Sequence, residues 1–159
     1  MPSWSLPHPP SSGLKKTIAA TPHAVYRAWL EPEVLKVWLA PGDLEVSRAE
    51  VDERVGGAYR IWQTASGADS GGFDCTFVEL VPDERIVLQL AFVGPKRSDG
   101  PTYDSRLTIT FAAGPDRFTV LTLVHEQLGE LAAAMPDAAE KVGPGWDLVL
   151  DKLNATFAV

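Results

Sequence analysis

The stretch KVGPGWDLVLDKLNATF, residues 141–157, decides the fold of this chain. Its apolar residues recur at helical spacing, as Trp146, Val149, Leu150, Leu153 and Phe157. This spacing places them on one face of an α-helix, so the stretch predicts a long C-terminal helix with a continuous apolar stripe. Because glycine and proline at 143–145 favour a turn, we expect the helix to begin at Trp146, with the carboxylate of Asp147 in its first turn.

The middle of the chain supplies the surface that this stripe would cover. Several segments alternate between apolar and polar residues, and Gly56-Gly57 and Pro82-Asp83 have the residue types of hairpin turns. Hairpins that follow one another predict an antiparallel sheet with one buried face. The six segments are 43–52, 54–64, 73–81, 85–93, 102–111 and 118–126, and residues 14–20 are a seventh candidate strand.

Two short helices are predicted between residues 14–20 and the rest of the sheet. Thr21 followed by Pro22 is a helix start, because the hydroxyl can cap the first turn and proline fits the first helical position. Pro32 interrupts the helix, since an interior proline loses a hydrogen bond and clashes with the preceding turn. A second short helix, residues 33–39, follows it.

Together these elements predict an α+β fold. A strongly twisted sheet is rarely filled by the single helix that crosses its concave face, so we expect a cavity between them. Residues 14–159 are expected to form one domain. Residues 1–13, rich in proline and serine, are expected to be a flexible extension in which only Trp4 could dock. The segment 127–145 is expected to be irregular.

The composition limits the kinds of molecule that the protein could bind. The 159 residues carry a net charge of −7, which disfavours nucleic acid and anionic membranes. No apolar run approaches the ~20 residues of a transmembrane helix, and the N-terminus does not have the pattern of a secretory signal. The single Cys75 cannot form an internal disulfide, and neither His8 nor His23 has a second ligand at metal-binding spacing. We therefore expect a cytoplasmic protein without a metal or cofactor.

Five ordered motifs resemble one family. The runs are TPHAVYRAWLEPEVLKVWLAP, DERVGGAYRI, FVELVPDERIVLQL, TVLTLVHEQL and GPGWDLVLDKL, and they span residues 21–153. They resemble the domain of activator-of-Hsp90-ATPase-like (AHSA1-like) proteins, within the SRPBCC superfamily of START and Bet v 1-type domains. The resemblance implies a helix-grip fold: a curved antiparallel sheet of six to seven strands, two short helices, and a long C-terminal helix over the concave face. It also implies a hydrophobic cavity.

We expect the protein to bind a small hydrophobic or amphipathic molecule in that cavity. Side chains that face inward by strand or helix parity would line it. The candidates are Trp38, Trp62, Phe77, Leu88, Leu90, Phe92, Tyr103, Leu107, Leu123, His125, Trp146, Val149, Leu150 and Leu153. Trp146 is expected to be both core and roof of the cavity, whereas the residues around Trp62 do not settle which face it occupies. Cys75 is expected to be a small buried residue.

Two other functions stay open. The resemblance implies that the chain could be an interaction or stress-response module for an Hsp90-type chaperone. It also implies a cyclase- or dehydratase-like enzyme, in which His125 would be the acid–base group. Catalysis is the less expected function, because the inward faces hold few polar groups. If the protein neither binds a ligand nor moves a proton through His125, this residue would be a histidine at the end of its strand that forms a hydrogen bond to a loop. The sequence also leaves a homodimer open.

Overall fold

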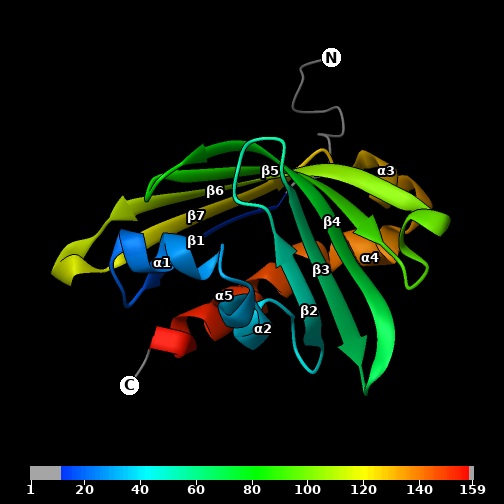
Figure 1. Cartoon of the computed structure of the whole chain (residues 1–159), viewed down its shortest axis with the longest axis horizontal. Coiled ribbons are helices and arrows are strands. Elements are labelled where there is room, and N and C mark those ends of the chain that lie inside the picture. Colours follow the sequence, from blue (N-terminus) through cyan, green and yellow to red (C-terminus); the bar gives the residue numbers. More distant parts are fainter. Residues whose placement is uncertain (1–11, 158–159) are drawn as a thin grey trace, which may run out of the picture.

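The computed structural model of the chain describes residues 12–157. Seven antiparallel strands form one sheet in the order β1-β7-β6-β5-β4-β3-β2, so every strand pairs with its sequence neighbour except β1, which pairs with β7 (Figure 1). This confirms the predicted sheet. The strands are β1 Ser12–Ile18, β2 Glu45–Val51, β3 Ala58–Ala65, β4 Ala68–Val81, β5 Arg85–Val93, β6 Thr102–Ala113 and β7 Thr119–Glu126.

Within residues 12–157, five α-helices accompany the sheet. They are α1 Pro22–Ala28, α2 Pro32–Trp38, α3 Gly129–Ala134, α4 Pro136–Glu140 and α5 Val142–Phe157. The two short helices and the long C-terminal helix confirm the expected helix-grip arrangement. The predicted helix start is also confirmed, since the hydroxyl of Thr21 accepts a hydrogen bond from the backbone N–H of Ala24 at 3.3 Å.

Several boundaries differ from the predictions, among them the start of β4, which lies at Ala68 instead of residue 73. The helix α5 begins at Val142 and includes Pro144, because a proline in the first turn lacks an N–H that would have no helical partner there. Residues 127–145, expected to be irregular, contain α3, α4 and the first turn of α5. The strand β1 begins at Ser12, before the expected start of the domain. The expected flexible extension and the docking of Trp4 lie otherwise outside the described residues.

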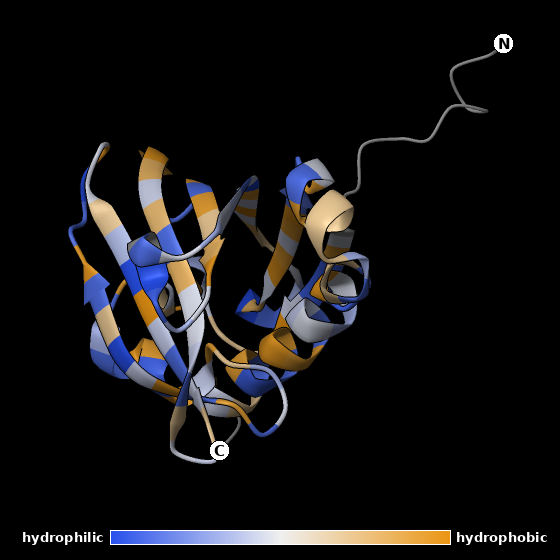
Figure 2. Ribbon diagram, turned by 90° about the vertical axis from the view of Figure 1, so that its right-hand side faces the viewer, coloured by the Kyte–Doolittle hydropathy of each residue, from blue (hydrophilic) through white to orange (hydrophobic). Residues whose placement is uncertain are grey.

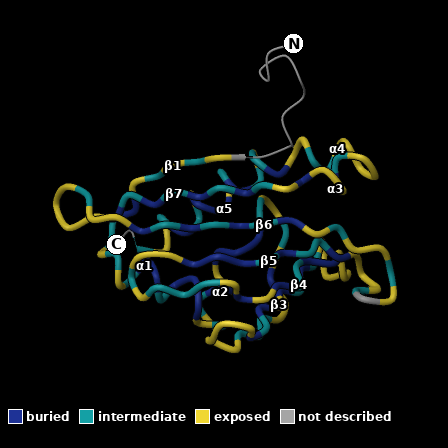
Figure 3. The backbone as a smooth tube through the Cα atoms, turned by 90° about the horizontal axis from the view of Figure 1, so that it is seen from above, coloured by how far each residue is buried: buried dark blue, intermediate teal, exposed yellow. Residues whose placement is uncertain are grey.

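The core lies between the concave face of the sheet and the helices. Figure 2 shows the sheet and the helices as two facing layers, and Figure 3 shows the buried residues concentrated along the central strands. In α5, the predicted stripe is buried from Trp146 to Leu153, while Phe157 is half-buried. Ion pairs also join α5 to the edge of the sheet. The ammonium of Lys16 on β1 pairs with the carboxylate of Asp147 and with that of Asp151, the second at 3.2 Å, and both aspartates lie on the outer side of α5.

Two glycines bring β4 close to both of its neighbours. A Cβ atom on Gly72 would lie 2.0 Å from the carbonyl oxygen of Ile61 on β3, and one on Gly71 would lie 2.2 Å from the carbonyl oxygen of Val93 on β5. Their φ angles, 149° and 99°, are also ones that other residues rarely adopt. Glycine at these two positions therefore lets the three backbones approach one another closely.

Candidate functional site

A cavity of about 240 Å³ lies above Gly72, between the strands and the first turns of α5. We call it the α5 lobe. Most of its walls are apolar, and α5 contributes Val142, Gly145, Trp146 and Val149. The other lining residues are Leu39, Pro41, Gln63, Ser70, Gly72, Phe73, Phe92, Val93, Ala138 and Lys141.

A second cavity, of about 410 Å³, adjoins the first. We call it the loop lobe, because the loop between β5 and β6 forms one wall and α3 and α4 form another. The two lobes have Ser70, Phe92, Val93, Ala138 and Val142 in common, so they lie side by side. The remaining lining residues are Gly94, Pro95, Pro101, Tyr103, Leu131 and Met135.

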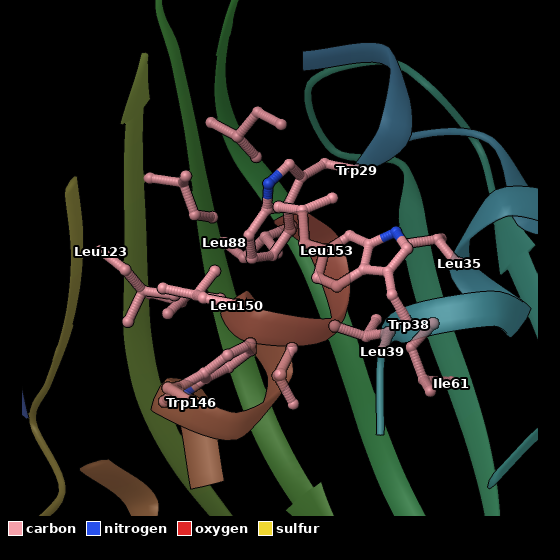
Figure 4. Close-up of a cluster of buried hydrophobic side chains, with 14 of the residues drawn as sticks. Trp29, Leu35, Trp38, Leu39, Ile61, Leu88, Leu123, Trp146, Leu150 and Leu153 are labelled. Carbon is pink, nitrogen blue, oxygen red and sulfur yellow. The ribbon is translucent and has the colours of Figure 1, made fainter. Parts of the chain in front are cut away.

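Aromatic rings form the wall between the α5 lobe and the core. The ring of Trp146 stacks on Phe73, with centroids 6.0 Å apart and planes at 22°, and Phe73 meets Phe92 edge to face at 5.6 Å. On its other side Trp146 lies 6.1 Å from Trp29, within the buried cluster of Figure 4. Trp146 is only 5% exposed. The wall is therefore held by packing on both sides of the indole, and does not depend on a ligand.

A hydrogen-bond chain runs from Trp146 into the sheet. Its indole Nε1–H donates to Nδ1 of His125 at 2.9 Å. Because an indole can only donate, Nδ1 must be the unprotonated nitrogen, and the proton of a neutral ring sits on Nε2. Nε2 then donates to the hydroxyl of Ser105 at 2.7 Å, and this hydroxyl donates to the carbonyl oxygen of Leu90 at 3.0 Å. Every polar group in this series has a hydrogen-bond partner, so the series connects α5 with the strands β7, β6 and β5.

Burial keeps His125 neutral. The side chain has no exposed surface, and desolvation lowers its pKa from 6.5 to about 4. Phe92 stacks on the imidazole with ring centroids 5.3 Å apart. Both ring nitrogens are engaged within the protein, and neither lobe includes the ring in its lining. The geometry thus assigns His125 to the support of the cavity wall and does not favour the acid–base role that the enzyme hypothesis requires.

Few polar groups reach the α5 lobe. Gln63, 8% exposed, points from β3 into it, and its Nε2 donates to the carbonyl oxygen of Leu39 at 3.2 Å. The amide cannot be turned around, because its oxygen would then face another oxygen. Its Oε1 is therefore fixed toward the other side, and it has no hydrogen-bond donor within residues 12–157. Lys141 and Ser70 add an ammonium and a hydroxyl at exposed positions.

Only part of the predicted lining is found in the walls of the two lobes. Phe92, Tyr103, Trp146 and Val149 line them. The inward residues of the middle of the sheet and the buried residues of α5 belong to one hydrophobic cluster, so they pack against each other between sheet and helix. These core residues are Trp38, Phe77, Leu88, Leu90, Leu107, Leu123, Leu150 and Leu153, and His125 lies with them. Cys75 is also in this core, as expected.

Trp62 was wrongly placed among the lining residues. The inward residues of β3 are Tyr59, Ile61 and Gln63, so Trp62 lies on the convex face of the sheet. There its ring packs between two guanidinium groups, 4.8 Å from Arg48 and 4.4 Å from Arg97. The indole is half-buried by this packing and has no route to the cavity.

Sequence reasoning missed Gln63, Phe73, Ser105 and the α3–α4 segment. Ser105 shares strand parity with Leu107, which was the available signal, but a small polar residue at an inward position does not reveal its partner. Among the described residues, no group of three histidine, cysteine, aspartate or glutamate side chains is placed to hold a metal ion. No helix in the same part of the chain is long and apolar enough to cross a membrane.

The fold and the site together define a helix-grip domain with a cavity between its sheet and its long helix. The chain belongs to the family described as Activator of Hsp90 ATPase homolog 1-like protein, whose model matches residues 19–158. No match was found among curated proteins.

Solved structures of bacterial proteins share the fold. Protein CV1439 from Chromobacterium violaceum is 33% identical, with a TM-score of 0.75, and the match covers 92% of this chain and 96% of that one. Protein NE0264 from Nitrosomonas europaea is 21% identical, with a TM-score of 0.77 and coverage of 94% and 95%. The AHSA1 protein SPO3351 from Silicibacter pomeroyi is 18% identical, with a TM-score of 0.75 and coverage of 93% and 97%. The last two likenesses concern the fold alone.

Proposed function

We propose that the protein binds a small hydrophobic or amphipathic molecule in the α5 lobe, with the loop lobe available to the rest of a longer ligand. The observation that carries the proposal is the α5 lobe itself, whose mostly apolar walls include one fixed acceptor, Gln63 Oε1, that has no donor among the described residues. Ligand sites usually combine an apolar lining with a few fixed polar groups that orient the ligand. Here Gln63 Oε1 would accept a hydrogen bond from a hydroxyl or N–H group of the ligand.

The first test fills the α5 lobe. Gly145 lines it, and the only atom near a Cβ placed there is Cβ of Pro41, 4.0 Å away. We expect Gly145→Leu to project into the cavity and to weaken the binding of neutral amphiphiles such as 1-decanol and 2-naphthol at least tenfold. A tenfold loss corresponds to about 1.4 kcal/mol of binding free energy. Calorimetric titration of the wild type and the variant measures it.

Gly129→Leu is the matched control. It adds the same side chain at the start of α3. No atom lies within 4 Å of a Cβ placed there, and Gly129 lines neither lobe. Binding to this variant should equal that of the wild type. The proposal fails if neither amphiphile binds to the wild type, or if Gly145→Leu folds and binds both ligands unchanged.

The other hypotheses gain no support from a specific contact. Binding to an Hsp90-type chaperone, a homodimer and a cytoplasmic location stay predictions from the sequence. Catalysis through His125 would require a ligand to displace Ser105 or Trp146 from the ring.

A further inference from the structure

The entrance of the α5 lobe carries one positive charge. Lys141, which precedes α5, is the only charged residue among those that line either lobe. Its side chain has no salt-bridge partner within residues 12–157, whereas Lys16 and Lys36 both pair with carboxylates. Lys141 is exposed, so its ammonium lies in contact with water at the rim of a mostly apolar space.

The start of α5 adds to this charge. The N-terminus of a helix is equivalent to roughly half a positive charge, because its first N–H groups have no helical acceptor. An acidic side chain in the first turn would offset it, but α5 has none there. Val142 and Gly145, both in this turn, line the lobe together with Lys141. The helix terminus and the ammonium therefore act on the same end of the cavity.

The chain as a whole is acidic, with a net charge of −7. Its long-range field does not attract anions, so a preference for an anion would have to arise locally. At physiological ionic strength charges are screened over about 8 Å, which limits the influence of distant carboxylates on an exposed group at the rim.

We propose that the ligand is an amphipathic anion, with a carboxylate or similar acidic head at Lys141 and the start of α5, and an apolar body in the cavity. This rests on the proposed function and specifies the ligand class for the same site. The aromatic wall can bind the apolar body of any ligand, whatever the charge of its head group. The anionic head is what places the ligand with its polar end outward.

Three compounds with ten carbon atoms each test the head group. Decanoate, 1-decanol and decylamine carry a negative, neutral and positive head at pH 8. We expect decanoate to bind about three- to fivefold more tightly than 1-decanol in 50 mM salt, as suits an exposed ion pair, and decylamine to bind most weakly. Raising the salt to 0.5 M should remove the advantage of decanoate and leave the binding of 1-decanol unchanged or slightly stronger.

Variants of Lys141 assign the preference to this residue. Lys141→Gln should reduce the affinity for decanoate to that of 1-decanol, and Lys141→Glu should place it below. Lys15→Gln is the control, because it removes the same charge from an exposed position on β1 that lines neither lobe. Because both lysines are exposed, we expect neither substitution to unfold the protein, and a melting curve of each variant checks this. A change in affinity can then be assigned to the lost charge.

The outcomes separate the two proposals. If 1-decanol binds as tightly as decanoate, or if Lys141→Gln leaves their ratio unchanged, the ligand is not selected as an anion at this rim, while binding in the cavity stands. If none of the three compounds binds, the anionic ligand and the proposed function are both overturned.

Discussion

Replacing Trp146 with alanine should lower the free energy of unfolding by about 3–5 kcal/mol, the range of large-to-small substitutions of buried aromatic residues. The indole packs against Phe73 and Trp29, and its N–H is the donor to His125. The variant would remove these contacts, leave a cavity at the first turns of α5, and deprive the buried Nδ1 of its donor. Urea denaturation followed by circular dichroism measures the loss.

Trp146→Phe separates packing from hydrogen bonding. Phenylalanine keeps an aromatic ring in the wall but cannot donate to Nδ1 of His125, and an unsatisfied buried acceptor costs about 1–3 kcal/mol. We therefore expect an intermediate loss. Leu148→Ala, on the exposed side of the same helix at 49% exposure, should change the stability by less than about 0.5 kcal/mol. A loss below 1 kcal/mol for Trp146→Ala would contradict the role of the indole.

The second large effect is a loss of stability in acid that depends on His125. Its pKa is about 4 in the folded protein and ~6.5 in the unfolded chain. Between these values the unfolded chain binds more protons than the folded protein, so the free energy of unfolding falls as the pH falls from 6.5 to 4. The loss from this residue amounts to about 3 kcal/mol, and above pH 6.5 it is absent.

His125→Asn provides the comparison. It is expected to be less stable at pH 7.5, because asparagine does not fill the site between Phe92 and Trp146, but it has no imidazole to protonate. Its free energy of unfolding should therefore fall less steeply between pH 6.5 and 4 than that of the wild type, whereas titration of the carboxylates is common to both proteins. Equal slopes over this window would show that His125 does not resist protonation.

The layout of the fold was largely readable from the sequence, for definite reasons. The stripe from Trp146 to Leu153 has helical spacing, and the segments of the sheet alternate with period two, so each element shows its buried face. Pro144 misled the prediction of where α5 begins, because a helix-breaking residue and a residue of a first helical turn look alike in sequence. The short helices α3 and α4 span only six and five residues, too few to show a clear period.

The site was harder to read, because parity tells which side chains face inward and not which of them border empty space. Leu88 and Phe92 share one face of β5, but only Phe92 lies where α5 leaves the sheet uncovered. The space depends on where the first turns of α5 lie against the sheet, and that position results from the packing of the whole domain. The partners of His125 come from another strand and from α5, so its hydrogen bonds could not be derived from the strand that carries it.

We expect ligands to enter the α5 lobe beside Trp146. The most direct measurement is the set of tryptophan indole N–H signals in ¹H–¹⁵N correlation spectra during titration with decanoate. The indole of Trp146 lines the lobe, whereas that of Trp38 lies in the core and donates to the carbonyl oxygen of Ala28 at 3.2 Å. We predict a progressive, saturable shift of the Trp146 signal and little change for Trp38. A saturating titration in which the Trp146 signal does not move would contradict the account.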